Sequence, residues 1–340
     1  MKSANKILLT LLILTAGLSG VCSAQQETQF TQYMFNRMYY NPAYAGSSGS
    51  ICATAMYRNQ WMGLRLDAPA PGYKSGSAPV NYLFSFDLPV KFLHGGLGAT
   101  VISDQIGYHN SINVNVDYAF RIYWGPGNLA AAAELNMYNN TLDGSQLIGS
   151  SSQTGIPTTP IDASVVDPLI AASEESDFLI DMSTGLYYQV PGSYYLGLSI
   201  KNLLGSKSDI LNYENARSIY MMGGYEYTLP FNPSFRLKPS ALVKTADFAA
   251  FQADVSCLLS YQNSVWGGVS YRVHDAFAFM GGINWKKLQI GAAYDLTTSR
   301  LGTFKSGRSQ GTVELYLKYC FKVIIPQKAP SIYRNTRYLL

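Results

Sequence analysis

Residues 114–122 read VNVDYAFRI, and every second residue of this stretch is apolar while most of the others are polar. Successive side chains of a strand point to opposite faces, so a strand here has one apolar and one polar face. The same alternation returns in residues 251–261 (FQADVSCLLSY) and 313–323 (VELYLKYCFKV). Such strands are typical of a transmembrane β-barrel with lipid outside and a polar lumen.

The pattern extends over most of the chain and predicts an all-β fold, an antiparallel transmembrane barrel of about 14 strands, an even number as bacterial barrels require. The expected strands are residues 50–60, 80–88, 96–103, 111–122, 128–139, 178–190, 193–202, 218–228, 235–244, 250–261, 264–273, 276–285, 288–297 and 311–323.

The chain begins like an export signal. Lys2 and Lys6 precede the apolar run 7–18, and Cys22-Ser23-Ala24 resembles a small-residue cleavage site. The expected division of the chain is a signal peptide (1–24), an N-terminal plug-like segment (25–49), an outer-membrane barrel (50–323) and a periplasmic C-terminal tail (324–340).

Composition supports a membrane barrel. Charged residues make up 14% of the chain, against about 25% in a typical soluble domain, yet the mean hydropathy is only +0.01. The 26 tyrosines suit the aromatic girdles of such barrels. A soluble β-sandwich or propeller is the alternative, because it uses the same period-two strands. The formal net charge of +4 argues against a nucleic-acid partner.

The expected connections alternate in length. Short turns such as 124–127 and 262–264 alternate with longer stretches such as 61–79, 140–177 and 298–310. Outer-membrane barrels have short periplasmic turns and long external loops. With the N-terminus in the periplasm, the long connections would face outward.

No constellation predicts an enzyme, a cofactor or a metal site. The three histidines fall at expected turns or loops, and no Ser or Asp has a recognisable catalytic spacing. After the signal, Cys52, Cys257 and Cys320 are far apart and odd in number. The pattern therefore predicts buried thiols and no shared disulfide.

Residues 28–46 do not have the pattern of a strand. Apolar residues recur there near helical spacing before the turn-forming pair Asn41-Pro42. We expect this segment to lie in the lumen or across the periplasmic mouth, with Tyr33, Phe35 and Tyr40 as anchors. Asn36 and Asn41 are expected to satisfy backbone groups.

Many charged residues fall on the polar face of the expected strands. Charges that face lipid are costly, so these side chains should point inward and pair with one another. They are Arg58, Asp117, Arg121, Asp181, Lys201, Arg236, Lys238, Lys244, Asp254, Arg272, Asp295, Glu314 and Lys318.

The N-terminal block resembles the PorP/SprF family of type IX secretion membrane proteins. Residues 29–36 (QFTQYMFN), 40–46 (YNPAYAG) and 57–61 (YRNQW) match three blocks with which family members open. Shorter matches follow along the chain, including 104–107 (DQIG) and 266–272 (WGGVSYR). The loop 140–177 has no recognisable family pattern.

The resemblance implies a non-enzymatic outer-membrane component of the type IX secretion or gliding system of Bacteroidota. Its implied partners are membrane lipid, other type IX components, and secreted cargo with a C-terminal signal domain, such as adhesins that it docks, exports or retains. The alternative is a plugged solute channel or a transporter of hydrophobic compounds. The partner or plug candidates are Gln32, Tyr33, Phe35, Asn36, Tyr40, Asn41, Pro42, Arg58, Asn59, Gln60, Trp61, Arg337 and Tyr338.

Overall fold

The computed structural model describes residues 27–66, 76–144, 173–211, 213–248, 250–299 and 309–322. The expected signal peptide (1–24), the tail (324–340) with Arg337 and Tyr338, and most of the loop 140–177 lie outside these residues.

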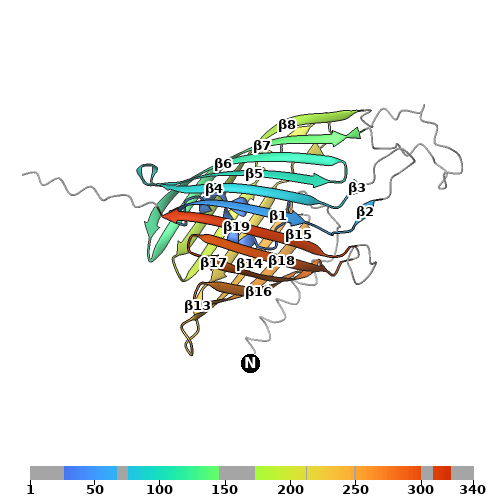
Figure 1. Ribbon diagram of the computed structural model, residues 1–340. Helices are drawn as coiled ribbons and strands as arrows, with labels where there is room; N and C mark the ends of the chain where they lie inside the picture. Colours follow the sequence, from blue (N-terminus) through green and yellow to red (C-terminus); the bar gives the residue numbers. More distant parts are fainter. Residues whose placement is uncertain are drawn as a thin grey trace, which may run out of the picture.

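The chain folds as a closed barrel of 14 antiparallel strands (Figure 1). Each strand pairs with its neighbours in sequence. The ring closes where the first strand pairs with the last, and we call this β1–β19 pairing the seam. The strands are β1 (Ser50–Asn59), β4 (Val80–Val90), β5 (Gly95–Ile106), β6 (His109–Trp124), β7 (Gly127–Asp143), β8 (Glu174–Val190), β9 (Tyr194–Lys201), β12 (Ser218–Tyr225), β14 (Phe235–Ala246), β15 (Ala250–Tyr261), β16 (Val265–Arg272), β17 (Ala276–Trp285), β18 (Leu288–Thr297) and β19 (Thr312–Lys322).

Short ladders and one short helix complete the described connections. β13 (Tyr227–Thr228) continues β12 beyond Glu226 and pairs with the same neighbour, β14. The others are β2 (Arg65–Leu66) with β3 (Gly76–Ser77), β10 (Lys207–Ser208) with β11 (Tyr213–Glu214), and the 3-10 helix η3 (Lys91–Leu93). Among the described residues, no helix is long and apolar enough to cross a bilayer.

Every expected strand is present, although the longest extend beyond the predicted ends. β6, β7 and β8 have 16, 17 and 17 residues. A strand of about 9–11 residues suffices to cross the bilayer. The extra residues of β7 and β8 are polar or acidic and continue toward the long connection between them, so these strands project from the membrane at that end.

The two ends of the barrel differ in their connections. At one end, the short-turn end, strands are joined through residues 91–94, 125–126, 191–193, 262–264 and 286–287, with 229–234 slightly longer. At the other, the long-connection end, four joining stretches are long (60–79, 144–173, 202–217 and 298–311), and three are short (107–108, 247–249 and 273–275). Because periplasmic turns are short in outer-membrane barrels, the short-turn end is expected to face the periplasm.

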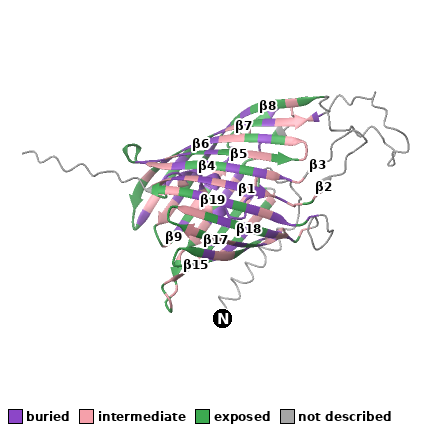
Figure 2. Ribbon diagram, viewed as in Figure 1, coloured by how far each residue is buried: buried purple, intermediate pink, exposed green. Residues whose placement is uncertain are grey.

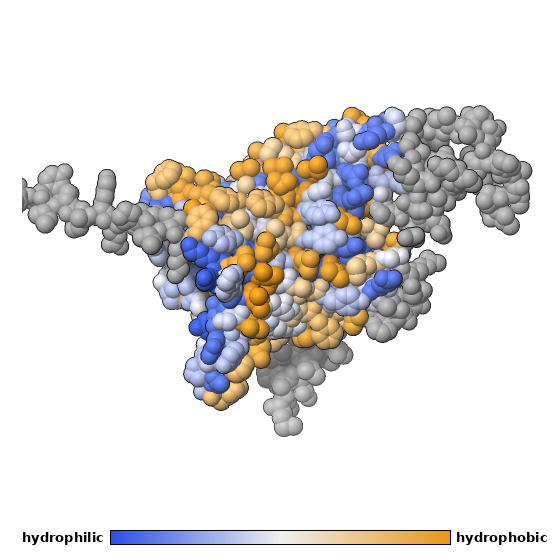
Figure 3. Space-filling model, viewed as in Figure 1, coloured by the Kyte–Doolittle hydropathy of each residue, from blue (hydrophilic) through white to orange (hydrophobic). Residues whose placement is uncertain are grey.

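Burial alternates along the strands and separates a lipid face from a luminal face (Figure 2). On β6, Val116 and Phe120 are exposed, whereas Asn115 and Asp117 between and beside them are buried inside. Figure 3 shows apolar surface over the strands, with hydrophilic patches toward the two ends. The outside is therefore the apolar side, as a lipid-facing barrel requires.

We expect a charge on the outer face to destabilise the barrel. Val116 and Val255 are exposed on that face. Val116→Arg or Val255→Arg should cost up to ~4 kcal/mol, the cost of Arg at the bilayer midplane. Urea unfolding in lipid vesicles, followed by tryptophan fluorescence, measures this, with Val→Ile at each site as the control. Arg variants as stable as the Ile variants would contradict the assignment of this face to lipid.

The prediction of no shared disulfide is wrong. Cys52 on β1 and Cys320 on β19 lie opposite each other across the seam and form a disulfide, while Cys257 is free. The two cysteines are separated by 268 residues. They meet only because closure brings the first strand beside the last, a proximity that sequence spacing does not show.

Candidate functional site

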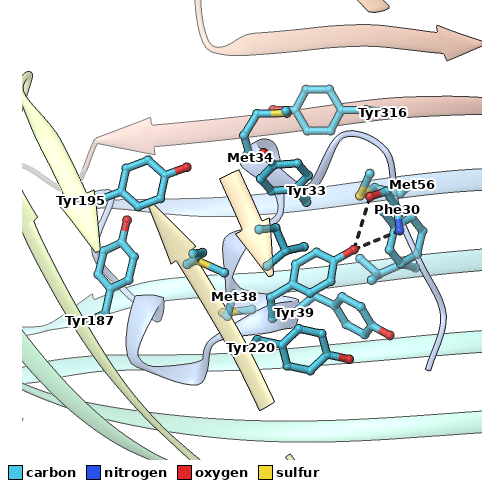
Figure 4. Packing of buried hydrophobic residues seen from close by; sticks show 14 of the residues in the cluster. Phe30, Tyr33, Met34, Met38, Tyr39, Met56, Tyr187, Tyr195, Tyr220 and Tyr316 are labelled. Atoms are coloured by element: carbon cyan, nitrogen blue, oxygen red, sulfur yellow. Dashed lines mark hydrogen bonds between the residues drawn. The ribbon is translucent and has the colours of Figure 1, made fainter. Parts of the chain in front are cut away.

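The lumen is occupied by residues 27–46, which we call the luminal segment. It consists of the 3-10 helix η1 (Tyr33–Phe35), the four-residue helix α2 (Arg37–Tyr40) and the 3-10 helix η2 (Pro42–Tyr44). Most of its residues are buried, and the others are half-buried. Figure 4 shows its apolar side chains packed between strands of the barrel wall.

The luminal segment runs from one end of the barrel to the other. Near its start, the Glu27 carboxylate accepts a hydrogen bond from the side-chain nitrogen of Asn202 (3.1 Å). Asn202 directly follows β9 at the long-connection end. At its finish, the Arg121 guanidinium donates to the carbonyls of Ala45 (2.8 Å) and Gly46 (3.1 Å), near the short-turn end of β6. The first described residue, Glu27, thus lies at the long-connection end, whereas β1 begins at the short-turn end. The sequence pattern did not predict this path through the lumen.

Asn41 and Pro42 shape the middle of this path. Proline is well suited to the first position of a helix, and asparagine to the capping position before it. The Asn41 side chain accepts a hydrogen bond from the amide of Ala43 (2.9 Å). Its side-chain nitrogen donates to the carbonyls of Leu186 (2.9 Å) and Leu198 (3.3 Å) in the barrel wall. Asn41 therefore satisfies backbone groups, as expected.

The same expectation for Asn36 is wrong. Its side-chain nitrogen is buried and has no hydrogen-bond partner among the described residues. The reason is geometric: Asn36 lies between η1 and α2, and its side chain caps neither helix.

Aromatic side chains attach the luminal segment to the wall. The Phe35 ring lies 4.5 Å from the ring centre of Trp266 and 4.8 Å from that of Tyr316. The Tyr33 hydroxyl is 3.0 Å from the Ser240 hydroxyl. Tyr40 packs edge-on against Tyr220 of β12, at 5.5 Å. All three expected anchors thus contact the wall from inside.

A buried carboxylate pair holds the beginning of the luminal segment. The two carboxylate oxygens of Glu314 accept hydrogen bonds from the backbone N–H groups of Thr31 (2.7 Å) and Gln32 (2.8 Å). The Asp295 carboxylate accepts a hydrogen bond from the Thr31 hydroxyl (2.6 Å). Arg58 bridges both acids, at 2.9 Å from Glu314 and 3.0 Å from Asp295. We call Arg58, Asp295 and Glu314 the carboxylate clamp.

Further ion pairs surround this clamp. Arg272 pairs with Asp254 (3.0 Å), and Lys244 lies 3.7 Å from the same carboxylate. Arg272 also approaches Asp295, at 3.8 Å. The expectation that luminal charges pair with one another is confirmed for these residues. Because charges out of water need close partners, the clamp and its neighbours form one electrostatic unit.

The wall leaves room for the luminal segment at glycines. A Cβ atom on Gly185 would lie 2.3 Å from the Asn41 side-chain oxygen, and one on Gly98 would lie 2.5 Å from the Met38 sulfur. These distances exclude a larger residue unless the segment moves. These two glycines, which lie within β5 and β8, therefore mark close approach between wall and segment.

The structure brings most of the expected candidate residues together. Gln32, Tyr33, Phe35, Asn36, Tyr40, Asn41 and Pro42 all lie in the luminal segment, and Arg58 holds its beginning. Asn59, Gln60 and Trp61 follow Arg58 at the long-connection end, where the Trp61 amide donates to the Thr312 hydroxyl (3.0 Å).

Two important residues were absent from the candidates. Thr31 bridges both acids of the clamp, and Arg37 stacks on Tyr195, with its guanidinium carbon 3.8 Å from the ring centre. Both lie inside the QFTQYMFNR stretch. The available signal was the charge of Arg37, the only charged residue of that stretch; the sequence offers no comparable signal for Thr31.

Several solved barrels share the architecture only. The Acinetobacter baumannii outer membrane protein Omp33 is 9% identical, with a TM-score of 0.42, and the match covers 80% of this chain and 97% of the Omp33 chain. The CymD monoaromatic hydrocarbon channel is 13% identical, with a TM-score of 0.46, and the match covers 91% of this chain and 97% of the CymD chain. The P. putida toluene transporter TodX is 9% identical, with a TM-score of 0.46, and the match covers 83% of this chain and 93% of the TodX chain.

Sequence comparison places the chain more specifically. No curated protein matches it at a significant level. The family model described as "Type IX secretion system membrane protein PorP/SprF" matches residues 22–319, which include the luminal segment and nearly all of the barrel. The chain therefore belongs to the PorP/SprF family of type IX secretion system membrane proteins, and it is a multi-pass β-barrel of the outer membrane.

Proposed function

We propose that this barrel is a non-enzymatic and non-conducting scaffold of the type IX system that docks, exports or retains secreted surface proteins such as adhesins. The observation that supports this proposal is the luminal segment, which occupies the lumen between the two ends and is clamped by buried ion pairs. A barrel built to pass solutes needs an open path. A barrel that is filled can instead offer its two ends as rigid surfaces for other proteins.

Co-purification and conductance together test this function. A tagged chain isolated from native outer membranes is expected to bring with it other type IX components and cargo carrying the C-terminal signal domain. An unrelated tagged outer-membrane barrel serves as the control. The purified protein should be nearly silent in planar bilayers. Steady conductance without enriched type IX components would favour the alternative, a solute channel or hydrophobic-compound transporter.

A further inference from the structure

A polar hollow opens at the short-turn end, and we call it the cup. Its volume is about 380 Å³, and the luminal segment forms its floor through Met34, Phe35, Arg37 and Tyr44. The wall is made by the luminal faces of strands that end in short turns. The cup is therefore separated from the long-connection end by the luminal segment.

Two cations in the cup form no salt bridge with a described residue. Arg37 and Lys318 approach the same Tyr44 ring, at 5.7 Å and 6.0 Å from its centre. Arg37 also donates to the Met34 carbonyl (3.0 Å) and to the Tyr187 hydroxyl (3.1 Å). No described carboxylate forms a salt bridge with either cation, although Lys318 is buried and Arg37 is half-buried. Such cations are sites for an anionic group.

The carboxylates near the cup are already engaged. Glu226, which lines it, lies 2.9 Å from Arg236 and 3.6 Å from Lys238. Asp87 is buried in the wall, accepts a hydrogen bond from the Ser48 hydroxyl (3.4 Å), and interacts electrostatically with Lys318 and Arg121. The single Asp87 carboxylate offsets only part of the charge of Lys318 and Arg121, so net positive charge, that of Arg37 included, remains at the cup.

The cup also contains acceptors without donors. The side-chain oxygens of Gln189 and Asn284 are buried in its wall, and neither has a hydrogen-bond partner among the described residues. A buried acceptor left unpaired costs ~1–3 kcal/mol. A carboxylate or phosphate ion could pair with the cations but has no N–H group to offer these oxygens. A peptide has both kinds of group.

A neighbouring hollow continues the positive surface. It measures about 450 Å³ and shares Gln189 with the cup. Lys91, His94 and Arg121 line it, without any carboxylate. An acidic ligand would thus meet favourable charge across this part of the short-turn end.

We infer that the cup binds an extended acidic peptide segment of a protein partner on the short-turn side. A ligand carboxylate pairs with Arg37 and Lys318. Backbone N–H groups of the peptide donate to the oxygens of Gln189 and Asn284 after these side chains turn toward the cup, and its apolar atoms contact the Tyr44 ring. The inference rests on the proposed docking function and supplies a site for it at the end expected to face the periplasm.

Binding of a defined peptide to the purified full-length chain tests this inference. The probe is a short, fluorescently labelled peptide in which Glu alternates with Ala, and fluorescence anisotropy gives its affinity. Lys318→Gln should weaken binding roughly tenfold, the scale of one lost charge-assisted contact. Lys318→Arg should retain binding. Lys286→Gln is the matched control, since Lys286 lies on a short turn at the same end but outside the cup.

Three outcomes would overturn the inference. The first is equal affinity of the wild type and Lys318→Gln, with both shown to be folded by heat-modifiable gel migration. The second is equal binding of a peptide in which Lys replaces Glu. The third is complete displacement of the peptide by inorganic phosphate at comparable concentration, which would indicate a small-anion site.

A second measurement separates this inference from the proposed function. Tagged Lys318→Gln and Lys286→Gln chains are isolated from native outer membranes. Loss of type IX components from the Lys318 variant alone supports the cup as the docking site. Retention of these components by both variants overturns the inference and leaves the docking function standing.

Discussion

Deletion of residues 28–46 is expected to turn a silent barrel into a conducting one. Eight-stranded barrels are filled by their own wall side chains, whereas barrels of about 16–18 strands leave an aqueous channel. With 14 strands, this barrel lies between these limits, and the luminal segment fills the space. Without the segment, the charged inner wall would be hydrated and ions could pass. Planar-bilayer conductance and uptake of small antibiotics by cells measure the effect.

This deletion needs a control that keeps the segment in place. Thr28→Ala removes one hydrogen bond, from the Thr28 hydroxyl to Asp104 (2.8 Å), at the entrance of the lumen. We expect this variant to remain silent. A deletion variant that folds as a barrel, conducts no more than Thr28→Ala and retains its secretion partners would leave the segment without a role in closing the lumen.

Loss of the Glu314 carboxylate should cause the largest destabilisation of any single substitution in the lumen. Glu314 is completely buried, accepts two backbone amides of the luminal segment, and pairs with Arg58. Removing one partner of such a buried pair costs ~3–5 kcal/mol, because the other charge loses its compensation. We therefore expect Glu314→Ala to lower the urea midpoint strongly and to increase amide exchange in the luminal segment.

An exposed ion pair provides the matched control. Lys207 and Glu214 lie 2.8 Å apart, with side chains that are 65% and 57% exposed. Glu214→Gln should change stability by no more than ~1 kcal/mol, as is usual for surface pairs. Equal effects of the substitutions at Glu314 and Glu214 would show that the clamp does not hold the segment.

The strands were predictable because one physical constraint repeats along the chain. A barrel wall between lipid and a polar lumen imposes a period of two at every strand, so stretches such as 114–122 and 313–323 reveal it locally. The contents of the lumen impose no such repeat. The helices of the luminal segment are only three or four residues long, too short to establish a helical period.

Contacts between distant segments were harder to predict. The pairing of Cys52 with Cys320 follows from the ring closure and not from any local pattern. Asn41 caps η2 because it directly precedes Pro42, whereas Asn36 precedes no such turn and its side-chain nitrogen is unpaired among the described residues. The charge on Arg58 marked it as luminal, but only the fold places Glu314 and Asp295 around it.

The composition of the carboxylate clamp has a consequence for the order of assembly. Arg58 is on the first strand and Glu314 on the last, so the carboxylate clamp is incomplete until β19 has paired with β1. If the barrel closed first, the luminal segment would have to thread through it. If the sheet is still open, it can close around a luminal segment that already lies against it. Enclosure of the segment and completion of the ring are thus expected to be a single cooperative step. The Cys52–Cys320 bond spans the same two strands, and its appearance on a non-reducing gel would time that step.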